Sequence, residues 1–318
     1  MLRYIAKRVL LSLVTLWLLA TIVFIISTSL PSDPARAILG NTADEKAVNL
    51  FRKEFGLSDP WLTRYWRSIR GVFTFDFGKS WATKSDAWDL ISEAFARSAK
   101  LAILALLITV PIAIIAGLVA AAFRNTAIDR AIVLLGLATS SIPEFVTGAL
   151  LAVIFGVKLG WFPSVSVIPD GTSAWGQLEY LILPALALAI VYFGYIARMM
   201  RAGAIRSLEA DYTRTAVMKG LPANKIFSRH VLRNSLAPTI TVISAQCGYL
   251  FGGIVGVELI FNYPGLGKVL LNAVKKKDLP VLTVVVLIVG IVYMVATLIA
   301  DIIIAWLNPR ARLELESS

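Results

Sequence analysis

The chain contains few charged residues, a single cysteine and a single histidine. Of its 318 residues, 16% are charged and 58% are hydrophobic. A soluble domain of this length needs more polar surface, so the composition indicates a protein embedded in lipid. Cys247 has no second cysteine to pair with, which excludes an intrachain disulfide, and His230 alone excludes a multi-histidine metal site. We therefore expect this chain to bind neither a metal nor a cofactor.

The positive charge does not indicate a nucleic-acid-binding protein. The formal net charge is +11, but the lysines and arginines lie outside the long apolar runs and gather in a few loops. Loops rich in lysine and arginine set the orientation of a protein in a membrane. We expect membrane lipid, and no nucleic acid, as the partner of these charges.

Six apolar runs are each long enough to cross a membrane, which takes about 20 helical residues. They are residues 9–30, 101–123, 131–155, 181–200, 238–257 and 281–307. Basic residues precede the first run, as in a signal peptide, but that run is too long for one and lacks a good cleavage site. The sequence therefore predicts an all-α polytopic membrane protein with six transmembrane helices.

The placement of basic residues predicts which side each loop faces. An even number of spans puts both termini on one side of the membrane. The basic N-terminus, the short loop between Arg124 and Arg130, and the basic loop 201–237 fall in alternate segments and indicate the cytoplasm. The lysines at 275–277 are an opposing signal, which the other loops outweigh.

These boundaries divide the chain into four parts. They are a cytoplasmic N-terminus and first helix (1–30), an extracytoplasmic helical segment (31–100), a five-helix core (101–307) with its cytoplasmic loop (201–237), and a cytoplasmic tail (308–318).

The extracytoplasmic segment is amphipathic. Val48, Phe51 and Phe55 share one helical face, with Gly56 at the expected C-terminal cap. A second apolar stripe follows at spacings of three and four, formed by Trp61, Tyr65, Ile69 and Val72. The segment is either a pair of helices lying on the membrane interface or a ledge that receives a soluble partner.

The loop 201–237 predicts two short helices between membrane spans. Ser207 is placed to cap a helix that runs to Lys219, and Gly220 lies just past its end. A second helix carries a basic stripe suited to anionic headgroups, formed by Lys225, Arg229 and Arg233, and the fifth span then begins at Pro238. Capped helices between two spans can transmit force from a cytoplasmic partner into the membrane.

This loop carries a family resemblance. Residues 211–220 read Asp-Tyr-Thr-Arg-Thr-Ala-Val-Met-Lys-Gly, and residues 230–238 read His-Val-Leu-Arg-Asn-Ser-Leu-Ala-Pro. Both stretches resemble the cytoplasmic loop of ABC importer permeases of the dipeptide/oligopeptide/nickel family. Ala216 and Gly220 keep the core of the general signature, whereas Arg214 and Thr215 replace its first two residues, as in the peptide-family variant.

Further motifs extend the resemblance over nearly the whole chain. They are Pro-Ser-Asp-Pro at 31–34, Phe-Gly-Leu-Ser-Asp-Pro at 55–60, Phe-Asp-Phe-Gly-Lys-Ser at 75–80, Ser-Ile-Pro at 141–143, Phe-Asn-Tyr-Pro-Gly-Leu-Gly at 261–267 and Asn-Pro-Arg at 308–310. The long segment after the first span is similar to that of the B-type subunit of this family.

The resemblance implies a type I ABC importer permease in the bacterial inner membrane. It would form half of a pathway for peptides or similar solutes, paired with a homologous C-type permease, two ATPases and an extracytoplasmic binding protein. ATP and Mg²⁺ would be used by the ATPases, since this chain has no Gly-x-x-x-x-Gly-Lys-Ser/Thr loop and is not itself an enzyme. The residues implied in ATPase coupling are Asp211, Tyr212, Thr215, Ala216, Lys219 and Gly220.

Polar groups within the spans are candidates for the pathway, because they are costly in lipid. The candidates are Glu144, Ser141, Gln246 and Tyr249. Glu144 follows Pro143, where we expect a kink; it could attract a cationic group of the substrate, pair with a basic residue of the partner permease, or lie near the interface. For Gln246, hydrogen bonding between helices is an alternative role.

Three glycines in the fifth span, Gly248, Gly252 and Gly256, recur every four residues and predict a face for close helix packing.

Three other classes of membrane protein fit less well. A secondary transporter predicts an internal repeat with paired broken helices and an acid cluster, and neither is found in the sequence. A channel predicts a polar stripe or filter loop. A membrane enzyme needs a catalytic set that one histidine and one cysteine cannot supply.

Overall fold

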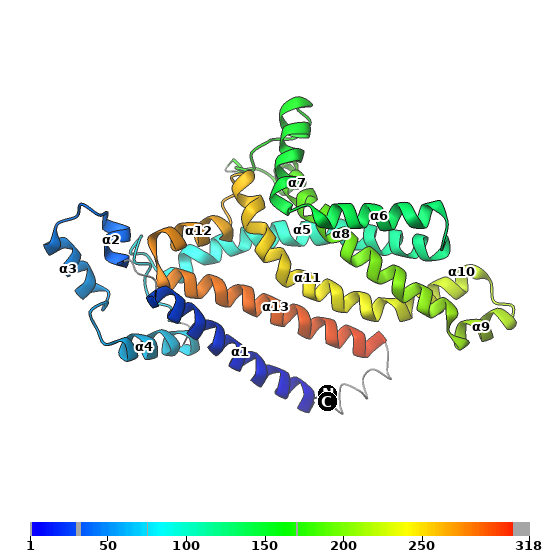
Figure 1. Ribbon diagram of the computed structural model, residues 1–318, viewed down its shortest axis with the longest axis horizontal. Coiled ribbons are helices and arrows are strands. Elements are labelled where there is room, and N and C mark those ends of the chain that lie inside the picture. Colours follow the sequence, from blue (N-terminus) through cyan, green and yellow to red (C-terminus); the bar gives the residue numbers. More distant parts are fainter. Residues whose placement is uncertain (1, 30–32, 75, 170, 308–318) are drawn as a thin grey trace. The chain divides into compact units, whose positions relative to one another are not determined.

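The computed structural model describes residues 2–29, 33–74, 76–169 and 171–307. Secondary structure within these ranges is helical, apart from an isolated β-bridge between Lys79 and Asp86 (Figure 1). The predicted tail 308–318 and parts of the motifs at 31–34 and 75–80 lie outside the described residues. The all-α prediction is confirmed.

Five helices are long and apolar enough to cross a membrane. They are Arg8–Ser29 within α1 (Leu2–Ser29), α5 (Ala87–Ala122), α8 (Ala174–Glu209), the continuous run Ala223–Ile260, and α13 (Leu279–Leu307). Each matches one of the predicted runs to within a residue at its C-terminal end or contains it, and several begin well before it. A bent pair of helices supplies a sixth candidate.

The predicted third span, 131–155, is broken rather than continuous. It consists of α6 (Ala127–Ser141) and α7 (Glu144–Leu151), which runs on into the π-helix η1 (Ala152–Lys158), and the two arms meet at 99°. The break falls at Ile142 and Pro143, both extended, because the proline ring disfavours helical geometry in the residue before it. The predicted position of the kink is confirmed. The angle of 99° is large enough that the two helices form separate arms instead of one straight span.

The chain forms two compact units, which are described separately. One is built mainly from Lys100–Tyr263, and the other from Lys7–Ala99 with Pro264–Val292. The predicted extracytoplasmic segment thus shares a unit with the first span and with the residues that follow Tyr263.

The second unit packs short helices around the end of α1. They are α2 (Pro34–Leu39), α3 (Glu45–Glu54), α4 (Trp61–Thr74) and α12 (Leu266–Lys276). Asp33 starts α2 by accepting a hydrogen bond from the Ala35 amide at 3.1 Å, with Pro34 at the first helical position. Gly56, at φ +61°, follows α3 as predicted.

The two apolar stripes of this segment form its core. Phe24 of α1 is buried in edge-on contact with Trp61 and Tyr65, with ring centroids 5.3 and 5.5 Å away. Buried residues of both predicted stripes join this cluster, namely Val48, Phe51, Tyr65 and Ile69. The predicted faces are confirmed, except that Trp61 remains half-exposed.

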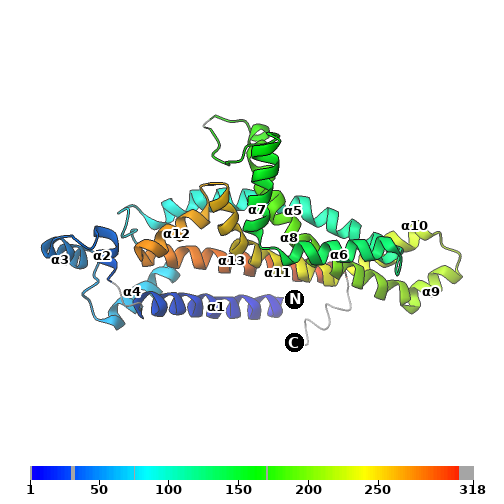
Figure 2. The ribbon, with the colours of Figure 1, turned by 45° about the horizontal axis from the view of Figure 1, so that its top comes forward.

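In the first unit α8 is the central helix, with α6 and α11 (Leu232–Ile260) packed along it (Figure 2). Helices α6 and α8 touch backbone to backbone. A Cβ added to Gly194 would lie 1.9 Å from the carbonyl oxygen of Gly136. The sequence alone does not predict this glycine pair, since the two residues are far apart in the chain.

Candidate coupling loop and intramembrane polar site

The predicted coupling helix is α9 (Asp211–Met218), and it begins three residues later than expected. Helix α8 continues to Glu209, and Ala210 is the extended residue between the two helices. Ser207 is therefore not a cap: it is buried in the last turn of α8, where its carbonyl accepts a hydrogen bond from the Thr213 hydroxyl at 2.6 Å. A buried serine on the packed face of a helix cannot turn to cap the next one.

The end of α9 is as predicted. Lys219 is the C-cap, and Gly220 follows in the left-handed region at φ +72°. The Gly220 amide donates to the Val217 carbonyl at 2.9 Å, and the Leu221 amide donates to that of Ala216 at 3.2 Å. These bonds satisfy carbonyls that the end of the helix would otherwise leave unpaired.

The residues expected to couple to an ATPase divide between two faces of α9. Ala216 is buried in an apolar cluster with Ala121 of α5, Ala204 of α8, and Ile226 and Val231. The other five predicted coupling residues are exposed, namely Asp211, Tyr212, Thr215, Lys219 and Gly220. Ala216 therefore attaches α9 to the spans and does not offer an outer contact.

Two exposed apolar side chains extend the outer face of α9 beyond the prediction. Val217 and Met218 are 58% and 80% exposed, and Tyr212 is 43% exposed. Large apolar side chains that protrude from a loop helix are typical of a contact surface. Their position in the sequence, directly before Lys219, is the signal that indicates this surface.

The predicted second helix of the loop is not separate from the fifth span. It comprises α10 (Ala223–Ile226) and the π-helical turn η2 (Phe227–Val231), which continue directly into α11. The expectation that a new helix begins at Pro238 is therefore wrong, because Pro238 lies inside α11. A proline is tolerated inside a membrane helix where neighbouring groups satisfy the freed backbone.

The basic stripe of this helix is exposed, as expected. Lys225, Arg229 and Arg233 all face away from the packed side. Arg233 is nevertheless occupied, since its Nε donates to the Leu307 carbonyl at 3.2 Å. Arg233 therefore binds the last residue of α13 through one of its donors, which the sequence does not predict.

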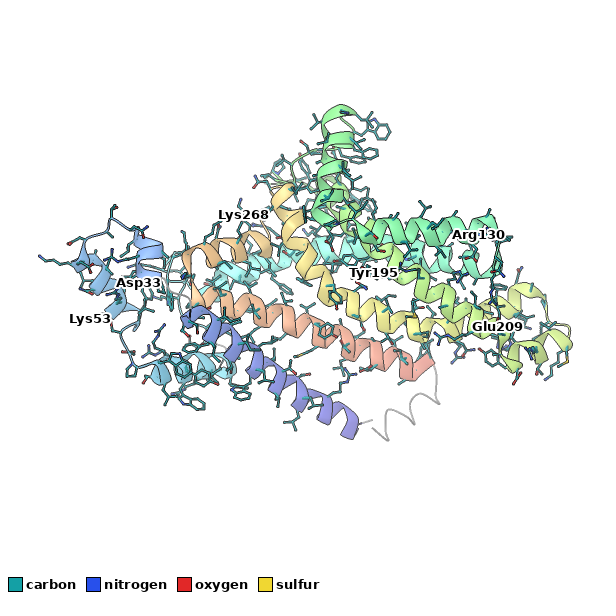
Figure 3. All side chains as sticks on the ribbon, viewed as in Figure 1. Asp33, Lys53, Arg130, Tyr195, Glu209 and Lys268 are labelled. Atoms are coloured by element: carbon teal, nitrogen blue, oxygen red, sulfur yellow. The ribbon has the colours of Figure 1, made fainter. Side chains whose placement is uncertain are left out.

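A buried ion pair fastens α6 to the same end of α8. Nε and Nη2 of Arg201 donate to the two carboxylate oxygens of Asp129 at 2.5 and 2.6 Å. The Asn125 amide also donates to this carboxylate, at 2.9 Å. Nearby, Arg124 pairs with Glu209 at the end of α8, and Glu209 and Arg130 are marked in Figure 3. In the sequence these arginines indicate only the orientation of the loops, and their ion pairs are not predicted.

Glu144 lies where three helices meet. It is the first residue of α7, and it accepts a hydrogen bond from the Tyr192 hydroxyl of α8 at 3.1 Å. A Cβ added to Gly253 of α11 would lie 2.8 Å from the Glu144 carboxyl group and 2.9 Å from that hydroxyl. The sequence predicted neither partner of Glu144.

The four predicted pathway residues do not form one cluster. Ser141 is exposed, and its hydroxyl donates to the Leu137 carbonyl at 2.8 Å. Gln246 is buried, whereas Tyr249 is 70% exposed. Glu144 with Tyr192 is the polar contact that the structure assembles from them.

Comparison with known proteins agrees with this geometry. Residues 113–313 match the family described as the binding-protein-dependent transport system inner membrane component, and residues 1–102 match the N-terminal part of such membrane components. The glutathione transport system permease protein of Escherichia coli (strain K12) is 35% identical over 312 residues, covering 98% of this chain and 99% of that protein.

A second relative, from Brucella abortus (strain 2308), is named for a peptide transport system permease. It is 36% identical over 308 residues, covering 97% of this chain and 98% of its own. The chain belongs to the binding-protein-dependent transport permease family.

This permease is a multi-pass inner membrane protein and a subunit of an ABC importer. Permeases of this family carry no cofactor, and the ATP is used by ATPase partners. A binding protein is the other partner that the family implies.

The glycine face of the permease is used only in part within the chain. A Cβ on Gly248 would lie 2.6 Å from the Tyr293 ring, and one on Gly256 would lie 3.0 Å from Cβ of Phe145. Gly252 is exposed, and no described atom outside its own helix turn lies within 4 Å of its added Cβ. The packing prediction thus fits Gly248 and Gly256 but not Gly252.

Gln246 lines a groove between α8 and α11 whose lining does not include Glu144. The groove has a volume of about 360 Å³, and Tyr195, marked in Figure 3, stands at its α8 side. The Arg198 guanidinium lies over the Tyr195 ring, 5.4 Å from its centroid. This stacking gives the arginine an aromatic partner.

Proposed function

We propose that the permease forms half of a translocation pathway for peptides or peptide-like solutes such as glutathione, driven by ATPases that act on α9. The substrate class is supported by the names of two relatives that match nearly the whole chain. The coupling role is supported by α9 itself, which is exposed on one side and buried on the other.

The attachment of α9 is the observation that carries this proposal. Ala216 belongs to one buried apolar cluster with Ala121 at the end of α5, Ala204 of α8, and Val231 just before α11. A push on the outer face of α9 is therefore delivered to three membrane helices together. Close-packed interiors transmit such displacements because they have little free volume.

The complex that we propose contains a homologous C-type permease and two ATP-binding subunits beside the binding protein. In this arrangement both termini and α9 face the cytoplasm, and the segment 31–100 faces outward. The basic loops around Arg124 and α9 support this orientation.

Glu144 is our candidate for substrate contact in the pathway. A carboxylate inside a membrane span attracts a cationic group, such as the amino terminus of a peptide. The Tyr192 hydroxyl holds the carboxylate in place by donating a hydrogen bond to it. Gly253 leaves room for the carboxylate because it has no side chain. The 99° break at Pro143 brings the start of α7 to this position.

Co-purification with the ATPases tests the proposed coupling. Replacing Tyr212 and Met218 by serine should remove the outer apolar contact of α9. ATPase recovery on the tagged permease should then fall by about ten-fold while the amount of permease in the membrane is unchanged. Undiminished ATPase recovery would refute coupling through this face.

A glycine pair provides a matched test of transmission. Gly220 and Gly160 both have positive φ, and neither has a described neighbour within 4 Å of an added Cβ. Valine at either position introduces the same backbone strain. We expect Gly220→Val to uncouple ATP hydrolysis from uptake, and Gly160→Val to leave the two coupled; equal effects would contradict the role of α9.

A further inference from the structure

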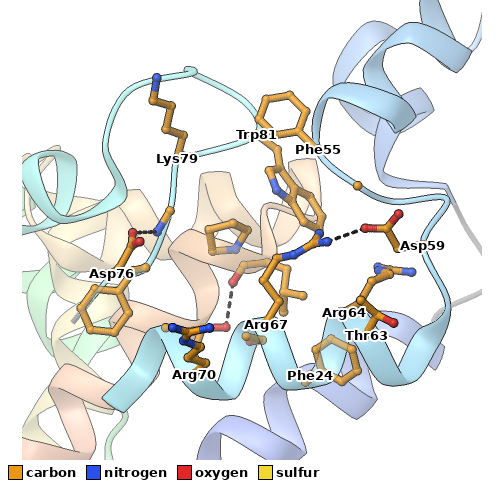
Figure 4. Close-up of a pocket in the computed structure, with 18 of the residues that line it drawn as sticks. Phe24, Phe55, Asp59, Thr63, Arg64, Arg67, Arg70, Asp76, Lys79 and Trp81 are labelled. Carbon is orange, nitrogen blue, oxygen red and sulfur yellow. Dashed lines mark hydrogen bonds and ion pairs between the residues drawn. The ribbon is translucent and has the colours of Figure 1, made fainter. Parts of the chain in front are cut away.

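A large cavity lies in the second unit, lined by α4, by the ends of α3 and α13, and by residues 76–81 (Figure 4). Its volume is about 1300 Å³. Three arginines of α4 line it at a spacing of three residues, namely Arg64, Arg67 and Arg70. Lys53 and Lys79 add two more cationic groups, against the carboxylates of Glu54, Asp59 and Asp76.

The acids of this cavity are already engaged. Asp59 pairs with Arg67 at 2.5 Å, and Glu54 pairs with Lys84 at 2.9 Å. Asp76 accepts a hydrogen bond from the Gly78 amide at 3.2 Å. Among the residues that the structure describes, no carboxylate lies within ion-pair distance of Arg64 or Arg70.

Arg64 is the more constrained of these two cations. It is partly buried, and burial lowers the pKa of its guanidinium, although Asp59 opposes this effect. A partly desolvated guanidinium is stabilised by an anion that donates oxygen atoms to its planar fork.

Helix α4, which lines this cavity, is held along α1 by side-chain hydrogen bonds. The Trp61 indole donates to the Thr28 hydroxyl at 3.4 Å, near the end of the first span. One turn further along α4, the Tyr65 hydroxyl accepts from the Trp17 indole at 3.2 Å and is 3.1 Å from the Thr21 hydroxyl. Helix α4 therefore packs along the side of the first span, from near its end at Ser29 to its middle.

The remaining face of α4 is apolar and exposed. Leu62, Trp66 and Phe73 are each more than half exposed. Exposed aromatic and aliphatic side chains on one face of a helix are typical of a surface that contacts lipid. Helix α4 thus has one face on α1, one face suited to lipid, and an arginine face turned into the cavity.

We propose that this cavity binds the phosphate of a membrane phospholipid headgroup, held by Arg64 and Arg70, while the acyl chains of that lipid lie against the exposed apolar face of α4. A free phosphate would satisfy the guanidinium groups but leave that apolar face uncovered. A guanidinium group binds phosphate through two parallel hydrogen bonds, and both arginines line the cavity, so each can contribute such a pair to one headgroup. The bound lipid fastens the segment 33–81 to the bilayer surface.

Native mass spectrometry of the purified importer complex tests this site, with phosphatidylglycerol as the probe. In Arg64→Gln/Arg70→Gln, phosphatidylglycerol retention should fall at least ten-fold. The matched control Lys46→Gln/Lys275→Gln removes two exposed cations that do not line the cavity, and should retain the lipid. Equal loss in both variants, or none in the first, would overturn the proposal.

Two further arms separate the sources of phosphate and guard against misfolding. Millimolar inorganic phosphate should not displace the lipid; displacement would show a free-anion site and overturn the lipid assignment. If the glutamine variant does not assemble, Arg64→Lys/Arg70→Lys replaces it in the test. This variant keeps the charge but lacks the planar fork, so we expect it to retain an intermediate amount of phosphatidylglycerol. Should retention stay complete while binding-protein affinity falls, the cavity serves a protein partner and the proposal fails.

Discussion

Arg201 of α8 forms a two-armed ion pair with Asp129 of α6, at 2.5 and 2.6 Å. The Asp129 side chain is only 4% exposed. The pair closes the short loop 123–126 against α8, because the same carboxylate accepts the Asn125 amide. The pair lies in the C-terminal part of α8, which leads into α9, so its loss should make the position of α9 less fixed.

We expect Asp129→Asn to destabilise the permease by about 3 kcal/mol, because it leaves a partly buried guanidinium without its charge partner. The thermal unfolding midpoint of the purified complex measures this. Arg124→Gln is the control: its partner Glu209 is well exposed, so the change should cost less than about 1 kcal/mol. Similar losses in both variants would show that the Asp129 pair is not special.

Gly194→Ala should destabilise the contact between α6 and α8. The new methyl group would lie 1.9 Å from the Gly136 carbonyl oxygen, so the two backbones must separate. Overpacking of this kind costs about 1–3 kcal/mol, and the midpoint of thermal unfolding should fall accordingly. Gly252→Ala adds the same group in open space and should leave the midpoint unchanged or slightly higher. A stable Gly194→Ala protein would contradict the close approach.

Asp278→Asn should release the loop at residues 80–82. The Asp278 carboxylate accepts the Ser80 hydroxyl at 2.5 Å and the Trp81 and Ala82 amides at 3.1 Å each. Asparagine presents an N–H group where a donor now binds, at a cost of about 2 kcal/mol. Faster hydrogen exchange at Trp81 and Ala82 reports the change.

Asp76→Asn serves as the comparison for this loop. Asp76 is exposed and accepts only the Gly78 amide in a turn. Exchange at residues 81 and 82 should not change in this variant. If both substitutions accelerated exchange there equally, Asp278 would not be the anchor of the loop.

Glu144→Gln should reduce uptake of cationic peptides by roughly ten-fold and affect anionic peptides little, because a charge-assisted contact is replaced by a neutral one. Uptake into proteoliposomes with both peptide classes measures this. Tyr192→Phe keeps the charge and removes only the hydroxyl that donates to it. Its effect should be smaller and independent of peptide charge; a uniform loss in Glu144→Gln would indicate a structural role.

The apolar runs determined the spans by themselves, because helices are the only way for this sequence to satisfy its backbone in lipid. Local chemistry was also sufficient to predict the end of α9 at Gly220, because glycine readily adopts the left-handed conformation that ends a helix. It was sufficient at Pro143 as well, because the proline ring disfavours helical geometry in the residue before it. The family motifs around Ala216 pointed to the same loop.

Only the tertiary structure decided which face each of these elements presents. Ser207 is a good cap by type, yet packing buried it in α8, and Ala216 turned inward where an outer contact was expected. The Asp129–Arg201 and Glu144–Tyr192 pairs join residues 72 and 48 positions apart. The close approach of Gly136 and Gly194 likewise joins two different helices. Spacing along one helix cannot encode such contacts, since they depend on where a second helix crosses.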